Sequence, residues 1–252
     1  MELSAYKQLC ATALESVAAA ARQKDEFAYL HAILGINGGV EDPGWQPIDE
    51  SRNFVYDLVS LINTPLNDQT KARLALVVYC HITEANFIYH DVFNLLLAAD
   101  GQPPNVFNFI HKVRNGKPPS VNAKLADIIS TAKRMEHVGI AAMFEEIWRP
   151  DIRNAVFHSD YILFGDELRI KHRPSQLAKI PLKYVFELLQ KTLHLFDAVL
   201  DIRMTGLRSF PKGHRITGRK SPKGHALASI DVIVDEDGCA HGFTTSDPMP
   251  IW

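Results

Sequence analysis

Apolar residues recur at helical spacing along most of the chain, and this pattern predicts a mainly α protein. Positions i, i+3, i+4 and i+7 lie on one face of a helix. The spacing is clearest in residues 182–200, where apolar positions on one side alternate with charged and polar positions on the other. The same pattern predicts further helices over residues 6–21, 27–34, 49–62, 69–99, 125–135, 139–148 and 150–159.

The longest of these patterns covers residues 69–99, and its first half is apolar on nearly every side. A helix that is apolar all round is buried by its neighbours. We therefore expect this helix to be the centre of the core. The two patterns nearest the N-terminus fit either one helix or a kinked pair.

Two short segments carry the signals of β-hairpins. Residues 161–170 surround Gly165-Asp166, which is typical of a type II′ turn, and residues 230–244 surround Asp237-Gly238, which is typical of a type I′ turn. The predicted fold is therefore a helical bundle with a small β-hairpin insertion and a small β-containing C-terminal extension. We expect a helical domain over residues 1–207, followed by a basic loop and small β appendage over 208–252.

Composition narrows the classes of protein that the chain can belong to. Hydrophobic residues make up 46% and charged residues 22% of 252 residues, as in globular proteins, and the net charge is −2. The chain as a whole therefore does not attract nucleic acid, and any such binding needs a local patch. Three cysteines without CxxC spacing favour a reducing compartment, which predicts a cytoplasmic protein. No signal peptide is recognised and no apolar run is long enough for a bilayer, so no membrane role is expected.

The candidate chemistry lies in the helix predicted over residues 150–159. Asn154, His158 and Tyr161 follow at i, i+4 and i+7, which predicts one polar helix face, and the long side chain of Arg153 reaches the same groove. An imidazole exchanges protons near neutral pH, and a guanidinium binds phosphate oxygens in pairs. Cleavage of RNA without a metal needs both functions: a base for the 2′-hydroxyl and a cation for the phosphate.

Arg153-Asn154, followed after three residues by His158, resembles the R-polar-x-x-x-H motif of the HEPN superfamily. Members of that family are helical bundles, and many are endoribonucleases of toxin, phage-defence and RNA-processing systems. The resemblance covers the core motif region, residues 123–200. It implies a metal-independent, cofactor-free endoribonuclease in which Arg153, His158 and Asn154 form the catalytic set. It also implies RNA as substrate, a homodimer in which two motifs meet, and an antitoxin-like protein as a candidate partner.

Three further residues are candidates for supporting roles at this site. Glu84 lies on the most apolar predicted helix, where an ionised carboxylate needs a polar partner, and either Arg153 or His158 would serve. Tyr161 and Asp160 follow the motif directly. The alternative is purely structural: Arg153 pairs with Asp160, and Glu84 forms an ion pair elsewhere in the bundle.

A metal site is a weaker interpretation of the same region. His81, Glu84, His90 and Asp91 have helical spacing that could ligate a metal. Di-iron bundles use Glu-x-x-His, however, and here the order is reversed and occurs once. We therefore predict no metal.

Six basic residues and no acidic residue lie between positions 208 and 225, and we expect them to form an RNA-binding patch. The alternative is a solvated loop. Two functions compete with the endoribonuclease: a non-catalytic HEPN-like nucleotide- or partner-binding module, and a helical scaffold. The six residues of this C-terminal basic patch are Arg208, Lys212, Arg215, Arg219, Lys220 and Lys223.

Overall fold

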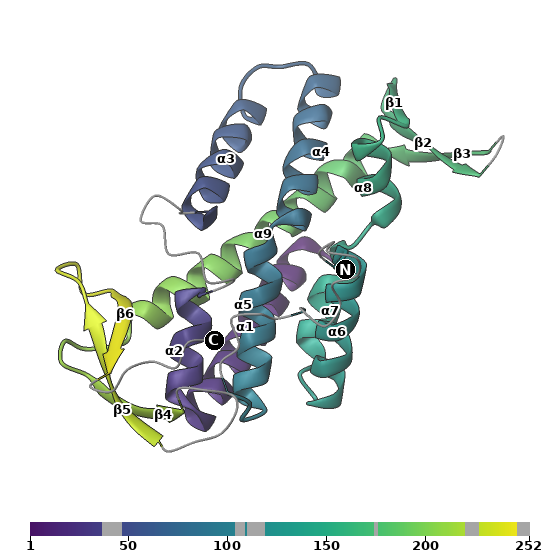
Figure 1. Ribbon diagram of the computed structural model, residues 1–252. Coiled ribbons are helices and arrows are strands. Elements are labelled where there is room, and N and C mark those ends of the chain that lie inside the picture. Colours follow the sequence, from purple (N-terminus) through teal and green to yellow (C-terminus); the bar gives the residue numbers. More distant parts are fainter. Residues whose placement is uncertain (37–46, 104–108, 110–118, 174–175, 220–226, 246–252) are drawn as a thin grey trace. The chain divides into compact units, whose positions relative to one another are not determined.

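The computed structural model describes residues 1–36, 47–103, 109, 119–173, 176–219 and 227–245. These residues form nine helices and two three-stranded antiparallel sheets, which confirms the mainly α fold with small β additions (Figure 1). Within them, no helix combines the length and the apolar character that crossing a lipid bilayer requires. The chain divides into two compact units, each built from three separate segments.

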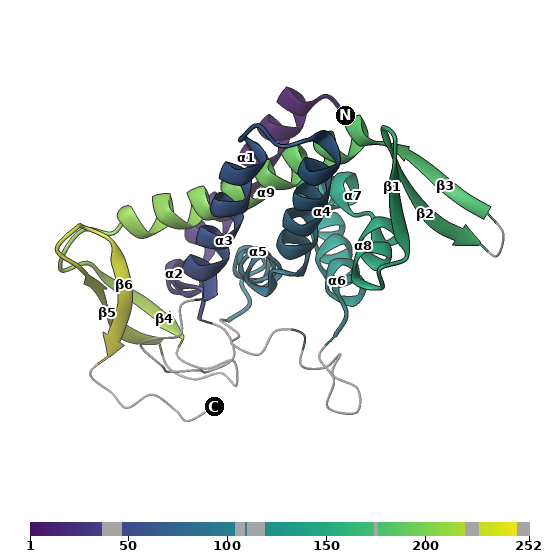
Figure 2. The ribbon, with the colours of Figure 1, turned by 90° about the horizontal axis from the view of Figure 1, so that it is seen from above.

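The first unit consists of Met1–Lys7, Asp42–Ala85 and Met143–Phe196. Helices α3 (Pro47–Ile62) and α4 (Asp68–Glu84) lie side by side as a helical hairpin (Figures 1 and 2). The side chain of Asn67 begins α4 by accepting the Thr70 N–H at 2.9 Å, which satisfies one of the open donors of the first turn. Helix α8 (Pro150–Phe157) packs against α4 and carries the predicted motif.

A three-stranded sheet follows α8 in the first unit. Strands β1 (Tyr161–Phe164) and β2 (Glu167–Arg173) form the expected hairpin, and Gly165 has the positive φ of 61° that a type II′ turn requires at its first central position. A third strand, β3 (Gln176–Pro181), pairs with β2. The prediction of a two-stranded insertion is therefore one strand short.

The second unit consists of Gln8–Glu41, Asn86–Ala142 and Asp197–Trp252. Its helical core contains α2 (Glu26–Leu34), α5 (Asn86–Ala99) and α6 (Val121–Arg134). Asp25 begins α2 by accepting the Ala28 N–H at 2.9 Å, which makes the N-terminal region two helices rather than one. The boundary expected between residues 207 and 208 falls inside this unit.

The C-terminal sheet packs on α2 within the second unit (Figures 1 and 2). The Phe27 ring meets the Phe243 ring edge-to-face with centroids 5.0 Å apart, and it lies against Gly218. The first strand of this sheet lies where the sequence predicted a loop. The sheet contains β4 (Arg215–Arg219), β5 (Leu227–Val234) and β6 (Ala240–Thr245) in that order.

The turn between β5 and β6 differs from the prediction. Val234 pairs with Ala240, so five residues rather than two connect the strands. Asp235 organises this loop, because its backbone N–H donates to the Cys239 carbonyl at 2.9 Å and its side chain accepts the Cys239 N–H at 2.8 Å. The type I′ prediction at Asp237-Gly238 is therefore wrong.

Three helices have residues in both units: α1 (Leu3–Lys24), α7 (Val138–Ile147) and α9 (Leu182–Arg208). Helix α9, with 27 residues, is the longest in the described part of the chain. The single long helix predicted over residues 69–99 is wrong, because Ala85 leaves the helical region with ψ 102° and separates α4 from α5. The spacing of apolar residues stays helical even when a single extended residue separates two helices. The sequence pattern therefore did not reveal the break at Ala85.

The contact between Gly218 and Phe27 predicts a large cost for a single methyl group. A Cβ added at Gly218 would lie 2.4 Å from the Phe27 Cβ, so Gly218→Ala should lower the free energy of unfolding by about 1–3 kcal/mol. Gly242→Ala in the same sheet is the matched control, because its Cβ would lie 3.7 Å from the nearest Ile233 atom. Urea denaturation measures both; equal stability of the two variants would contradict the packing described here.

Two histidines of the second unit, buried His31 and half-buried His90, predict loss of stability in acid. Burial lowers the pKa of His31 to about 4, and burial together with the Lys124 charge lowers the pKa of His90 to about 4. The unfolded chain binds these protons near pH 6.5, whereas the folded chain binds them near pH 4. The contribution of these histidines to the free energy of unfolding is therefore fully present above pH 6.5 and is lost as the pH falls toward 4.

The histidine contribution can be isolated with His31→Leu. Each buried histidine contributes at most about 1.4 kcal/mol per pH unit in this window, so the variant should lose less stability between pH 6.5 and 4 than the parent protein. His241→Leu removes an exposed histidine of β6 and serves as the control. Parallel curves for His31→Leu and the parent protein would show that His31 does not drive the effect.

Candidate functional site

Tyr79 fixes the start of the helix that carries the motif. Its hydroxyl accepts the Arg149 backbone N–H at 2.9 Å and lies within donating distance of the Ile147 and Arg149 carbonyls, at 3.2 and 3.3 Å. Burial raises the pKa of this phenol, so it remains a donor at physiological pH. Pro150 then occupies the first turn of α8, where a missing N–H costs nothing.

Arg149 carries a second set of contacts at the same helix end. Its Nε and Nη2 bind the two carboxylate oxygens of Asp151 at 2.9 and 2.6 Å, and its Nη1 donates to the Tyr184 hydroxyl at 2.7 Å. Partial burial raises the pKa of Asp151, but the hydrogen bonds and charge of Arg149 outweigh it, and the net shift is downward. Neither Arg149 nor Tyr184 was among the candidate residues predicted from the sequence. The Arg-Pro pair before the motif is the signal that could have indicated Arg149.

Arg153 is held by three neighbours. Its Nε and Nη2 donate to Glu84 Oε1 at 2.7 and 2.6 Å, and its Nη1 donates to Asn154 Oδ1 at 2.9 Å. The guanidinium carbon lies 4.5 Å from the centre of the Phe157 ring, a residue that the sequence analysis did not single out. A guanidinium has five N–H groups, so two remain without an acceptor within the described part of the chain.

His158 lies at the C-cap of α8 and is exposed. The helix ends there in a Schellman motif: the Asp160 N–H donates to the Ala155 carbonyl at 2.8 Å, and the Ser159 N–H donates to the Val156 carbonyl at 3.2 Å. Ser159 takes the left-handed conformation, with φ 57°, that glycine usually supplies in this motif. The His158 ring takes part in no hydrogen bond within the described residues, so both ring nitrogens are open to solvent or ligand.

The structure corrects the predicted polar strip. Tyr161 belongs to β1 rather than to the helix, so it does not continue a face with Asn154 and His158. Asp160 is exposed and does not pair with Arg153. The partner of Arg153 is Glu84. Five residues turn a helix by about 140° beyond one full turn, so Arg153 and His158 leave the helix in different directions.

The four candidate metal ligands either have other partners or belong to different units. His81 Nε2 lies 2.8 Å from Ser51 Oγ, and Glu84 binds Arg153. Both belong to α4, whereas His90 and Asp91 belong to α5 of the other unit. Among the described residues, no three His, Cys, Asp or Glu side chains gather as a metal site would require.

The C-terminal basic patch is only partly a loop. Arg208 ends α9 and Lys212 is exposed in the following turn, but Arg215 and Arg219 lie on β4. Arg215 Nε donates to Asp231 Oδ1 at 2.6 Å, which offsets its charge. The last two members, Lys220 and Lys223, lie outside the described residues.

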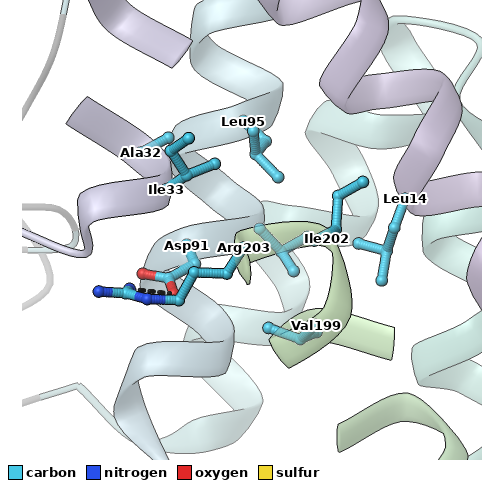
Figure 3. Close-up of a pocket in the computed structure, with 9 residues that line it drawn as sticks. Leu14, Ala32, Ile33, Asp91, Leu95, Val199, Ile202 and Arg203 are labelled. Carbon is cyan, nitrogen blue, oxygen red and sulfur yellow. Dashed lines mark hydrogen bonds and ion pairs between the residues drawn. The ribbon is translucent and has the colours of Figure 1, made fainter. Parts of the chain in front are cut away.

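A pocket of the second unit is lined by apolar side chains around a buried ion pair (Figure 3). Arg203 Nη1 lies 3.3 Å from Asp91 Oδ2, and Arg203 Nη2 donates to the Leu34 carbonyl at 2.6 Å. The cavity has a volume of about 10 Å³, which is room for one water molecule at most. Ligand sites are usually larger than about 300 Å³, so this pocket is structural rather than a substrate site.

Two arginine–carboxylate pairs should respond differently to mutation because they differ in exposure. The Arg153 and Glu84 side chains are 28% and 33% exposed, whereas those of Arg203 and Asp91 are 17% and 6% exposed. Glu84→Ala should lower the free energy of unfolding by less than about 1 kcal/mol. Asp91→Ala leaves a largely buried cation and should cost about 3 kcal/mol. Equal losses in urea denaturation would contradict this ranking.

Arg153 and His158 together offer a fixed guanidinium with two open donors and an exposed imidazole at the end of the same helix. A guanidinium can bind an anionic oxygen, and an imidazole can accept or donate a proton. Comparisons of the chain with protein-family models, curated proteins and solved structures find no match, so a function can be inferred only from this chemistry.

Proposed function

We propose that the protein is a metal-independent endoribonuclease of the HEPN type, with Arg153 and His158 as its catalytic residues. The observation that carries the proposal is the arrangement of Arg153, whose guanidinium is fixed by Glu84 and Asn154 while two N–H groups stay open. A fixed, forked donor is suited to the equatorial oxygens of a phosphodiester, because its geometry is set before charge develops.

The chemistry divides between the two side chains. The exposed imidazole of His158 takes the proton of the 2′-hydroxyl, and the resulting oxygen attacks the adjacent phosphorus. The bond from phosphorus to the 5′-oxygen breaks, and the leaving 5′-oxygen takes up a proton from water. The open N–H groups of Arg153 stabilise the negative charge that grows on the phosphate oxygens. Asn154 acts as a positioning residue, since its oxygen accepts from Arg153. The products are a 2′,3′-cyclic phosphate and a 5′-hydroxyl.

A homodimer is part of this proposal. Arg153 and His158 leave α8 in directions about 140° apart, so a two-fold axis beside the helix would bring Arg153 of one subunit toward His158 of the other. The Phe157 side chain between them is 53% exposed and offers an apolar contact for such an interface. We place this enzyme in the cytoplasm, in phage defence or as the toxin of a pair whose antitoxin-like partner restrains it.

One observation favours a non-catalytic binding module instead. Glu84 offsets the charge of Arg153, so the pair presents hydrogen-bond donors but little net positive charge. Such a site can hold a phosphate or nucleotide without accelerating its cleavage. Cleaved RNA distinguishes the two functions, because only the endoribonuclease produces it.

Cleavage of labelled single-stranded RNA in the presence of EDTA tests the proposal. The parent protein should release fragments ending in a 2′,3′-cyclic phosphate, and His158→Ala should slow this by about 10²–10⁴-fold, as expected for loss of a general base. His241→Ala, which removes an exposed histidine of β6, should retain full activity. Arg153→Lys should also impair cleavage, because an ammonium cannot fork onto two oxygens, while Arg134→Lys at an exposed ion pair should not.

The dimeric site is tested by mixing inactive variants. Subunits with Arg153→Ala and subunits with His158→Ala should regain part of the activity after mixing if residues from two chains form one site. Absence of cleavage by the parent protein on RNAs of varied sequence and structure would exclude the nuclease and leave the binding module.

A further inference from the structure

The outward face of the sheet formed by β1, β2 and β3 has an unusual composition. Cross-strand partners share a face, and the register pairs Ile162 with Arg169, Arg169 with Lys179, and Lys171 with Leu177. Phe164 shares this face because it lies two residues from Ile162 on the same strand. We call the outward surface that carries the following residues the basic sheet face: Ile162, Phe164, Arg169, Lys171, Leu177 and Lys179. Glu167, the cross-strand partner of Phe164, lies on the same surface.

The opposite face of this sheet accounts for its folding. Leu168, Ile170 and Ile180 are buried there, so the strands already have an apolar side that packs inside the first unit. The outward face of such a half-buried sheet is ordinarily polar. Here Ile162, Phe164 and Leu177 are instead 55%, 60% and 55% exposed. Folding does not require these three apolar side chains, so they need another explanation.

The charges on the basic sheet face indicate what covers it. Arg169, Lys171 and Lys179 are basic, and the one acidic residue on this face is Glu167, whose Oε2 lies 3.0 Å from both Arg169 Nε and Arg169 Nη2. Lys171 and Lys179 are exposed. The described part of the face therefore has an excess of positive charge, which is complementary to an anionic ligand.

Phe164 adds a surface for a flat ring. The Arg169 guanidinium carbon lies 4.1 Å from the centre of the Phe164 ring, and Glu167 holds that guanidinium in place. One side of the ring is thus covered, while the side chain as a whole stays largely exposed. Exposed aromatic rings and guanidinium planes beside basic residues are the features on which bases of single strands stack.

We propose that the basic sheet face binds single-stranded RNA, with bases on Phe164 and phosphates on Lys171 and Lys179. The inference rests on the proposed nuclease function and names the form of its substrate. Ile162 follows His158 by four residues, a chain length of at most about 14 Å, so one strand can contact both the face and the histidine. Double-stranded RNA keeps its bases stacked within the helix and would not use the Phe164 ring.

Binding is measured with the 252-residue chain carrying His158→Ala, so that the RNA stays intact, and with a fluorescein-labelled single-stranded oligonucleotide of mixed sequence. Phe164→Ala should weaken binding about ten- to a hundredfold, the loss expected for one stacked base. Lys171→Glu with Lys179→Glu should weaken binding further and make it less dependent on salt, because fewer counterions are released.

Matched controls separate this face from the rest of the surface. Leu227→Ala removes an exposed apolar side chain of β5, and Lys7→Glu reverses an exposed charge of α1; both should leave the affinity unchanged. A labelled duplex of the same sequence should bind more weakly than the single strand and should not respond to Phe164→Ala. Thermal denaturation of each variant confirms that it folds.

The outcomes distinguish this inference from the nuclease proposal. If the parent protein cleaves RNA and the sheet variants lower both affinity and kcat/KM, the inference is supported. Cleavage with unchanged affinity in the sheet variants would overturn the inference and leave the nuclease intact. Binding that depends on the sheet without any cleavage would support the inference and exclude the nuclease. A change in oligomeric state on Phe164→Ala, without an effect on RNA, would assign the face to a second copy and overturn the inference.

Discussion

The ion pair between Arg153 and Glu84 ties the helix that carries the motif to its neighbour α4. It contributes little to stability because both side chains are partly hydrated, but it decides where the guanidinium points. Tyr79, on the same helix as Glu84, holds the first turn of α8 through Arg149. Tyr79 and Glu84, five positions apart on α4, thus set both the start of α8 and the direction of its Arg153 side chain. The position of His158 follows, because α8 is eight residues long and His158 comes directly after its last residue.

The same contacts shape the electrostatics of the first unit. Glu84 offsets Arg153, and Asp151 offsets Arg149, so neither arginine acts as an open point charge. A phosphate would be recognised there by the direction of N–H groups. Long-range attraction of a phosphate would come from Lys171 and Lys179 on the basic sheet face. Both side chains are exposed, and neither takes part in the Arg149–Asp151 or Arg153–Glu84 pair. In the proposed function, attraction and orientation of the RNA strand would therefore come from different side chains.

The helices and the first hairpin could be predicted because their signals are local. The apolar stripe of residues 182–200 corresponds to α9, and the turn at Gly165-Asp166 has the expected positive φ. Strands β3 and β4 were missed because short strands beside basic or turn-forming residues resemble loops. The polar strip through Tyr161 was wrong because Ser159 takes a left-handed conformation and ends the helix, and serine does so far less often than glycine.

The sequence by itself determined the mainly α class, a helix start or a kink at Pro150, and the adjacency of Arg153, Asn154 and His158, because each depends on neighbours along the chain. The structure shows that a helix starts there. Only the tertiary structure decided that Glu84 rather than Asp160 binds Arg153, and that Tyr79 and Tyr184 hold Arg149. These partners lie 35 to 70 residues from the side chains that they contact. No local pattern encodes such pairings, because they arise when helices pack and buried or half-buried polar groups must find partners.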